Sequence, residues 1–112
     1  MLFIDSTHTV RHDGDCLHVY LRILPALDAT VTVQVHDIYL PETLALAQMR
    51  DQQLFWNEQY LLYAYMCGNS RTRAVYGSRY HARHNPEMLE HFMHERYRPG
   101  GASFWFEQQR AV

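Results

Sequence analysis

A stretch without glycine or proline runs from Glu42 to Met66 and is rich in residues that favour helices. It follows Pro41, and proline is favoured at the first position of a helix. Gly68–Asn69 supplies a stop signal shortly after it. The stretch therefore predicts one long helix, or two helices with a break near Asp51–Gln52, and the rest of the fold has to be arranged around it.

Two segments before this stretch alternate apolar and polar residues, which is the period of a half-buried strand: Cys16–Ile23 and Val31–His36. Pro25–Ala29 between them has the composition of a short loop. The two segments are therefore expected to pair as an antiparallel hairpin that places His18 opposite His36. This register gathers the apolar side chains of both strands on one face.

A further hairpin signal, Asp13–Gly14, lies upstream of these two segments. It would fold Ile4–His12 back onto the Cys16–Ile23 strand and would point His8 toward the core face. The expected result is a three-stranded antiparallel meander at the N-terminus.

The C-terminal part predicts a second helix and a last strand. Asn85 and Pro86 are a cap and a first-turn proline, and the helix is expected to run to about Tyr97 before Pro99–Gly101 ends it. Its expected buried stripe comprises Met88, Leu89, Phe92 and Met93. The aromatic segment Ser103–Glu107 has the composition of a short final strand.

These elements predict a two-layer α+β fold. The antiparallel meander of about three strands packs against the long central helix, and the C-terminal helix and the final short strand complete the structure. With 112 residues, of which 47% are hydrophobic and 20% charged, the chain has the size and composition of one globular domain over residues 1–112.

The cysteines and the apolar runs restrict the environment that the chain is expected to occupy. Cys16 and Cys67 are far apart and form no CxxC motif, so neither a disulfide framework nor a thiolate zinc site is indicated. Met1–Thr9 lacks the features of a signal peptide, and the apolar run Tyr60–Cys67 is far shorter than the ~20 residues that span a bilayer. A soluble cytoplasmic protein without a membrane partner is expected.

The segment Arg71–His84 concentrates positive charge in a chain of net charge −2, because it has four arginines and no acidic residue. All ten basic residues of the chain are arginine, and guanidinium groups fork onto phosphate or carboxylate. Tyrosine rings between them offer faces on which bases stack. The expected contacts to an anionic partner are Arg71, Arg73, Tyr76, Arg79, Tyr80, His81, Arg83 and His84. The alternative is a solvated basic segment that pairs with the protein's own carboxylates.

The second half of the Glu42–Met66 stretch is apolar nearly all round, so it is either buried on most sides or faces a partner. Aromatic side chains that would serve such an interface are Trp56, Tyr60, Tyr63 and, in the C-terminal tail, Trp105. They predict a protein partner or a second copy of the chain, as in an inhibitor or a homo-oligomer subunit of the kind that mobile elements encode.

Histidines and glutamates are spaced on the second helix so that imidazole and carboxylate groups share a face. His91 and His94 are three residues apart, and Glu87 and Glu90 each precede one of them by four. Zinc accepts both kinds of donor, so a zinc-dependent hydrolase is one reading and an exposed row of Glu–His pairs is the other. The cross-strand pair His18 and His36 is a second candidate ligand pair.

No catalytic residue can be assigned, because no serine or cysteine has the surroundings of an activated nucleophile and no phosphate-binding glycine loop is present. The leading expectation is a small non-enzymatic binding or regulatory protein that contacts nucleic acid or a nucleotide through residues 71–84. A protein-interaction module and a His/Glu metal-dependent hydrolase are the alternatives.

Overall fold

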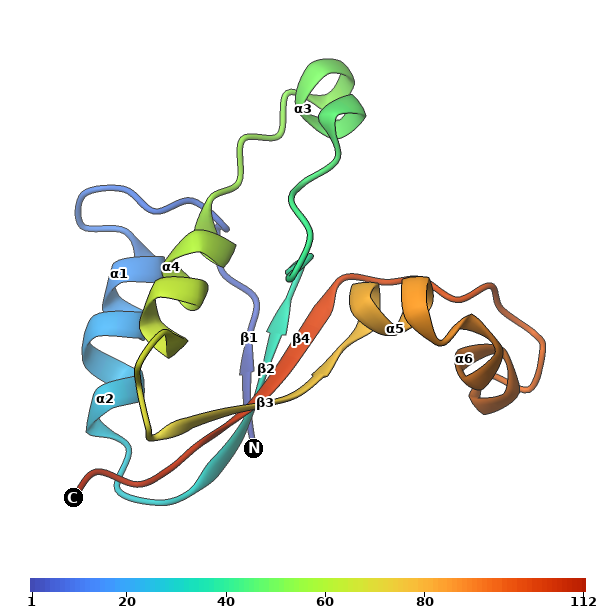
Figure 1. Cartoon of the computed structure of the whole chain (residues 1–112). Helices are drawn as coiled ribbons and strands as arrows, with labels where there is room; N and C mark the ends of the chain where they lie inside the picture. Colours follow the sequence, from blue (N-terminus) through green and yellow to red (C-terminus); the bar gives the residue numbers. More distant parts are fainter.

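Four strands form one mixed sheet in the computed structural model, which describes all 112 residues (Figure 1). The strands are β1 (Leu2–Ile4), β2 (Val31–His36), β3 (Thr72–Gly77) and β4 (Ser103–Gln108). The helical elements are α1 (Asp15–His18), the π-helical turn η1 (Val19–Ile23), α2 (Leu24–Ala26), α3 (Leu46–Gln52), α4 (Glu58–Met66), α5 (Ser78–His84) and α6 (Pro86–Phe92). The expected α+β class is confirmed.

The strands lie in the order β1-β2-β4-β3, and only the β1–β2 pair is parallel. The register aligns Val33 with Leu2 on one side and with Phe106 on the other. An irregularity between Ala74 and Tyr76 interrupts the pairing of β3 with β4. The strands predicted at Val31–His36 and in the tail are both confirmed, but their partners differ from the expected ones.

The segment predicted as a strand at Cys16–Ile23 is helical, so that prediction and the hairpin built on it are wrong. Cys16, Tyr20 and Leu24 recur every four residues and are completely buried, which is the spacing of one face of a helix. Leu21, one of the residues expected in the sheet core, is 60% exposed. Both periods are present in the sequence, and the fold buries the period-four set and not the alternating one.

The antiparallel meander is also wrong, because β1 ends at Ile4 and pairs in parallel with β2. Parallel strands need a crossover connection, and the helical stretch from Asp15 to Ala26 supplies it. His18 and His36 consequently do not form a cross-strand pair, since His18 ends α1. The expectation that His8 faces inward is confirmed, although it lies in a loop.

The central stretch forms two helices, which is one of the two forms expected from the sequence. The break falls after Gln52, where Gln53 adopts a left-handed conformation with φ of 54°. The helix does not begin at Pro41, because the side chain of Gln59 donates to the carbonyl of Glu42 and ties that backbone to α4 instead. The long central helix is therefore replaced by α3 and α4.

The C-terminal helix is shorter than expected, and fewer of its side chains are buried. α6 ends at Phe92, and His94 and Glu95 have φ of 56° and 57°, which no helix accommodates. Of the expected stripe only Leu89 is buried. In Figure 1 α5 and α6 project beyond the end of β3, away from the helices α1, α2 and α4.

One face of the sheet carries the core. On it lie α4 and, beside α4, the continuous helical stretch formed by α1, η1 and α2 (Figure 1). The buried side chains of this core are Ile4, Cys16, Tyr20, Leu24, Val33, Val35, Ile38, Leu62 and Phe106. None of the helices has both the length and the apolar character needed to cross a membrane.

Replacement of the central core residue, Phe106→Ala, should lower the free energy of unfolding by about 3–5 kcal/mol, because it leaves a cavity in a fully buried position. The matched control is Phe92→Ala, since Phe92 is 77% exposed and should cost at most about 0.5 kcal/mol. Urea denaturation of both variants measures the difference. Equal losses would contradict the placement of the core.

Candidate functional site

The basic segment Arg71–His84 forms β3 and α5 and is not an open loop. At its start, the Arg71 guanidinium donates to the carbonyls of Gln109 and Pro25 at 2.9 and 3.2 Å. Arg73 forms an ion pair with Glu107 across the β3–β4 pair, with an Nη2–Oε2 distance of 3.0 Å. Both side chains are thus engaged by the protein's own groups.

The two arginines of α5 lie one helical turn apart and have different partners. Arg83 forms an ion pair with Glu42 at 2.6 Å, and this hydrogen bond lowers the pKa of the Glu42 carboxyl. The Arg79 guanidinium lies over the ring of Tyr39, 5.1 Å from its centroid, and forms no ion pair with a carboxylate. Arg79 is therefore the arginine of this helix that is free to meet an anion.

Two cavities adjoin α5, and Pro41 lines both of them. The larger, of about 600 Å³, is mostly apolar and is lined by Tyr63, Met66, Phe104 and, from α5, Tyr80 and His81 among others. The second, of about 510 Å³, is lined among others by Tyr39, Glu42, Arg79 and Arg83. α5 thus presents aromatic groups to one cavity and guanidinium groups to the other.

Ring stacking holds the aromatic side chains of α5 against one another. The rings of Tyr76 and His81 are nearly parallel, with an interplanar angle of 9° and a centroid distance of 4.8 Å. Tyr80 packs against His84 at 4.5 Å. Burial raises the pKa of the Tyr76 hydroxyl. The rings of Tyr76, Tyr80, His81 and His84 thus lie together on this segment.

The expected interface residues are dispersed. Tyr60 and Tyr63 are exposed on α4, and Tyr63 lines the apolar cavity beside α5. Trp56 packs against the ring of His8 at 4.6 Å. Trp105 lies in β4 and donates its indole N–H to Ser103.

The histidines and glutamates expected to bind zinc lie at the C-terminal helix. Glu87, Glu90 and His91 belong to α6, and His94 lies beyond its end. No three of their donor atoms lie within 4.8 Å of one another.

A different polar cluster surrounds Glu58, in the first turn of α4. This carboxylate is 1% exposed and accepts hydrogen bonds from the Ser6 hydroxyl at 2.7 Å and from the Tyr20 hydroxyl at 2.9 Å. Its Oε2 is also 2.8 Å from Nδ1 of His8. Burial, followed by the nearby charge of Glu58, raises the pKa of Tyr20, and burial raises the pKa of the Cys16 thiol beside Ser6.

Backbone hydrogen bonds hold His8 against the start of α4. The amides of Asn57 and Glu58 both donate to the His8 carbonyl, at 3.0 and 3.1 Å, and the Val10 amide donates to Oδ1 of Asn57 at 2.6 Å. His8 has φ of 58°, a conformation that residues other than glycine rarely adopt. These contacts fix the backbone at His8, whose side chain is buried.

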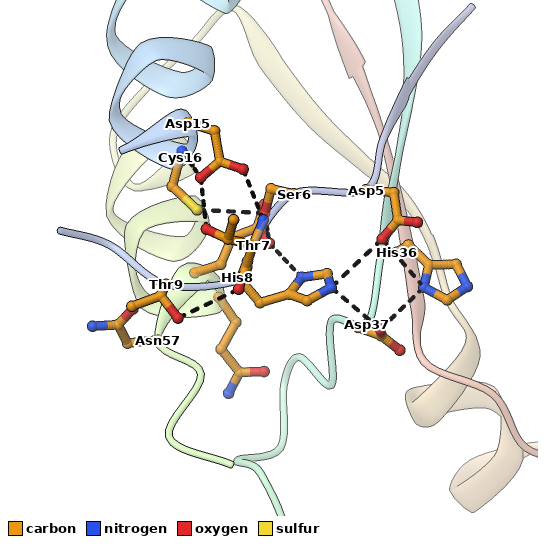
Figure 2. A network of polar contacts seen from close by, with 12 residues as sticks. Asp5, Ser6, Thr7, His8, Thr9, Asp15, Cys16, His36, Asp37 and Asn57 are labelled. Atoms are coloured by element: carbon orange, nitrogen blue, oxygen red, sulfur yellow. Dashed lines mark hydrogen bonds and ion pairs between the residues drawn. The ribbon is translucent and has the colours of Figure 1, made fainter. Parts of the chain in front are cut away.

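The other edge of the His8 ring faces two aspartates and a second histidine (Figure 2). Its Nε2 lies 3.3 Å from Oδ2 of Asp37 and 3.5 Å from Oδ1 of Asp5. Nδ1 of His36 lies 3.2 Å from the same Asp37 oxygen and 4.0 Å from the same Asp5 oxygen. Two imidazoles and two carboxylates thus converge at the ends of β1 and β2.

The sequence arguments did not single out this cluster, because they paired the N-terminal strands wrongly. Asp5 directly follows β1, and His36–Asp37 closes β2. Their convergence requires β1 and β2 to run in parallel, so that both strands end at the same edge of the sheet. The usable signal was the occurrence of Asp-x-x-His and His-Asp after two short apolar segments. Comparison with protein-family models, with curated proteins and with solved structures gives no significant match.

The substitution Tyr20→Phe tests the buried cluster, since it removes one hydrogen bond to Glu58 and leaves the packing intact. It should lower the free energy of unfolding by about 1–3 kcal/mol, because a buried carboxylate loses a partner. The matched control is Tyr60→Phe on the exposed face of α4, which should cost at most about 0.5 kcal/mol. Thermal or urea denaturation of the two variants gives the comparison, and equal stability would argue against the cluster.

The hydrogen bonds to the Asp15 carboxylate predict that the stability of the fold decreases at acidic pH. The hydroxyl and the amide of Thr7 donate to its carboxylate at 2.6 and 2.8 Å and lower its pKa from the ordinary value of 3.8. A lowered folded-state pKa stabilises the fold above the ordinary value, and this contribution is lost as the pH falls through the folded-state pKa. Asp15→Asn should therefore cost about 1 kcal/mol or less at pH 7. In pH-dependent denaturation the gap between this variant and the parent should close as the pH falls below 3.8 and through the lower folded-state pKa; a constant gap would contradict the assignment.

Proposed function

We propose that the protein binds a small anionic ligand that carries an aromatic ring, with a mononucleotide as the expected class, on the side of α5 where two cavities adjoin. The observation that carries this proposal is the division of α5 into an aromatic side and a guanidinium side. Tyr80 and His81 line a mostly apolar cavity, and Arg79 and Arg83 line the neighbouring one. Both cavities have volumes typical of small-molecule sites.

The aromatic cavity suits a planar base. Its walls include the side chains of Tyr63, Tyr80 and Phe104. Stacking of a base on an aromatic side chain contributes about 1–3 kcal/mol to binding and depends little on the identity of the base. A ring of this kind would therefore be held by its faces and not by a specific set of hydrogen bonds.

The neighbouring cavity suits a phosphate group. Arg79 has no carboxylate partner, and the exposed Arg83–Glu42 pair is of a kind that contributes little to stability. Exchange of Glu42 for a phosphate oxygen would therefore cost little, and guanidinium groups bind phosphate through forked hydrogen bonds. Two arginines one helical turn apart match one phosphate group.

A single nucleotide fits these contacts better than a nucleic-acid chain. A continuous row of phosphates would need the arginines of β3 as well as those of α5. Arg71 holds the backbone near the C-terminus, and Arg73 is paired with Glu107. The proposal therefore narrows the expected anionic partner to a ligand with one phosphate-bearing end.

Isothermal titration calorimetry at low salt with AMP, adenosine and inorganic phosphate tests the proposal. AMP should bind more tightly than either fragment, because it occupies both cavities. Arg79→Ala should weaken AMP binding by about tenfold or more, since it removes a charged donor, and should leave adenosine unaffected. Tyr80→Ala should weaken AMP and adenosine alike.

The control is Arg50→Ala, because Arg50 is also exposed and paired with a carboxylate but lines neither cavity. It should leave all three affinities unchanged. Absence of AMP binding up to millimolar concentration, or an equal loss in the Arg50 variant, would overturn the proposal.

A further inference from the structure

The ends of β1 and β2 bring together a set of metal-ligand donors that the proposed ligand site does not use. The strands run in parallel, so Asp5 after β1 and His36–Asp37 at the end of β2 meet at one edge of the sheet. The donor atoms of Asp5, His36 and Asp37 all lie within 4.8 Å of one another. The loop after β1 returns and adds Nε2 of His8 to the same place.

The spacing of these atoms suits one metal ion. A tetrahedral site with bonds of about 2.0–2.1 Å places neighbouring donors about 3.4 Å apart. The four nitrogen–oxygen distances between the histidines and the aspartates are 3.2, 3.3, 3.5 and 4.0 Å. Asp5, His36 and Asp37 form the compact part of the site, and His8 reaches it through the two aspartates. Binding of all four donors to one ion requires the two imidazole nitrogens to move toward a common centre.

The chemistry of the donors selects the class of metal. Two neutral imidazoles and two carboxylates balance the charge of a divalent cation. Imidazole favours zinc and related transition metals over magnesium and calcium, which prefer sets of oxygen ligands. Two nitrogen and two oxygen donors are a set that zinc accepts in tetrahedral geometry.

A buried carboxylate supports one of the imidazoles in the manner that metal sites use. Nδ1 of His8 is 2.8 Å from the Glu58 carboxylate, and Nε2 points at the aspartates (Figure 2). Histidines that bind metals almost always donate the other ring N–H to such a group, which fixes the tautomer and the orientation of the ring. Glu58 is itself held by Ser6 and Tyr20, so this support is rigid.

The burial of the four side chains is graded from the core to the surface. The side chain of His8 is 9% exposed, that of Asp37 is 28% exposed, and those of Asp5 and His36 are about half exposed. The inner donor is thus held in place before any ion arrives, and the outer donors leave a path from solvent. Both His8 and Asp37 adopt left-handed backbone conformations, with φ of 58° and 55°.

From these observations we infer that Asp5, His8, His36 and Asp37 form a binding site for one divalent transition-metal ion, with zinc as the expected ion. Glu58 acts as the positioning residue of His8. The site is independent of the ligand cavities on α5, and its failure would leave the nucleotide proposal untouched.

The test uses the full chain without an affinity tag, freed of metal with a chelator and titrated with Zn²⁺ in a calorimeter. The expected result is one Zn²⁺ per chain and a rise of several degrees in Tm, because an ion that binds only the folded state stabilises it. His36→Ala and Asp37→Asn should each weaken binding by about tenfold or more. The His36 side chain is about half exposed, so its variant should fold even if the Asp37 variant does not.

The matched control is His12→Ala, because His12 and Asp13 form a fully exposed His–Asp pair at 3.3 Å on the same loop. This variant should bind Zn²⁺ like the parent. His91→Ala is a second control, which tests whether the metal binds at α6. Loss of binding in the His91 variant but not in the His36 variant, or less than about 0.1 equivalent bound to the parent, would overturn the inference. Co²⁺ should give the visible absorption of a four-coordinate ion, and a purely octahedral spectrum would also contradict it.

Discussion

The buried carboxylate of Glu58 is the group on which the arrangement of the N-terminal half depends. A charge removed from water costs several kcal/mol unless partners replace its hydration. Ser6, His8 and Tyr20 supply those partners from the loop after β1 and from η1. The carboxylate therefore joins the loop, the crossover helix and α4 at one point, and removal of any partner leaves a buried acceptor unsatisfied.

The contact with Glu58 fixes the orientation of the His8 ring. This orientation in turn places His8 in the cluster at the sheet edge. With Nδ1 turned to Glu58, Nε2 has to face Asp5 and Asp37. Tyr39 borders a small cavity beside His8 and also lines the cavity that contains Arg79, whose guanidinium lies over its ring. It contributes no donor to the metal-ligand cluster, so the two proposed sites remain independent.

The sequence predicted those elements whose pattern has a single structural solution. Val31–His36 alternates cleanly and forms β2. The break after Gln52 was one of the two forms expected for the central stretch. Cys16–Ile23 fits two periods, and the choice between them depends on the burial of Tyr20 beneath α4, which is a tertiary property. Because that segment was assigned to the sheet, the parallel pairing of β1 with β2 could not be foreseen. The convergence of Asp5 with His36–Asp37 depends on that pairing and could not be predicted either. The residues from Tyr76 to His84, by contrast, are close in the sequence, so their proximity needs no tertiary information.

The most direct test of this account is the proton on Nδ1 of His8 in the metal-free protein, measured by long-range ¹H–¹⁵N correlation spectroscopy of the imidazole nitrogens. Orientation by Glu58 predicts a slowly exchanging Nδ1–H proton in a hydrogen bond to the carboxylate, because the two groups lie 2.8 Å apart. An Nδ1 without a proton, or rapid exchange of that proton with solvent, would show that Glu58 does not orient the ring and would contradict the account.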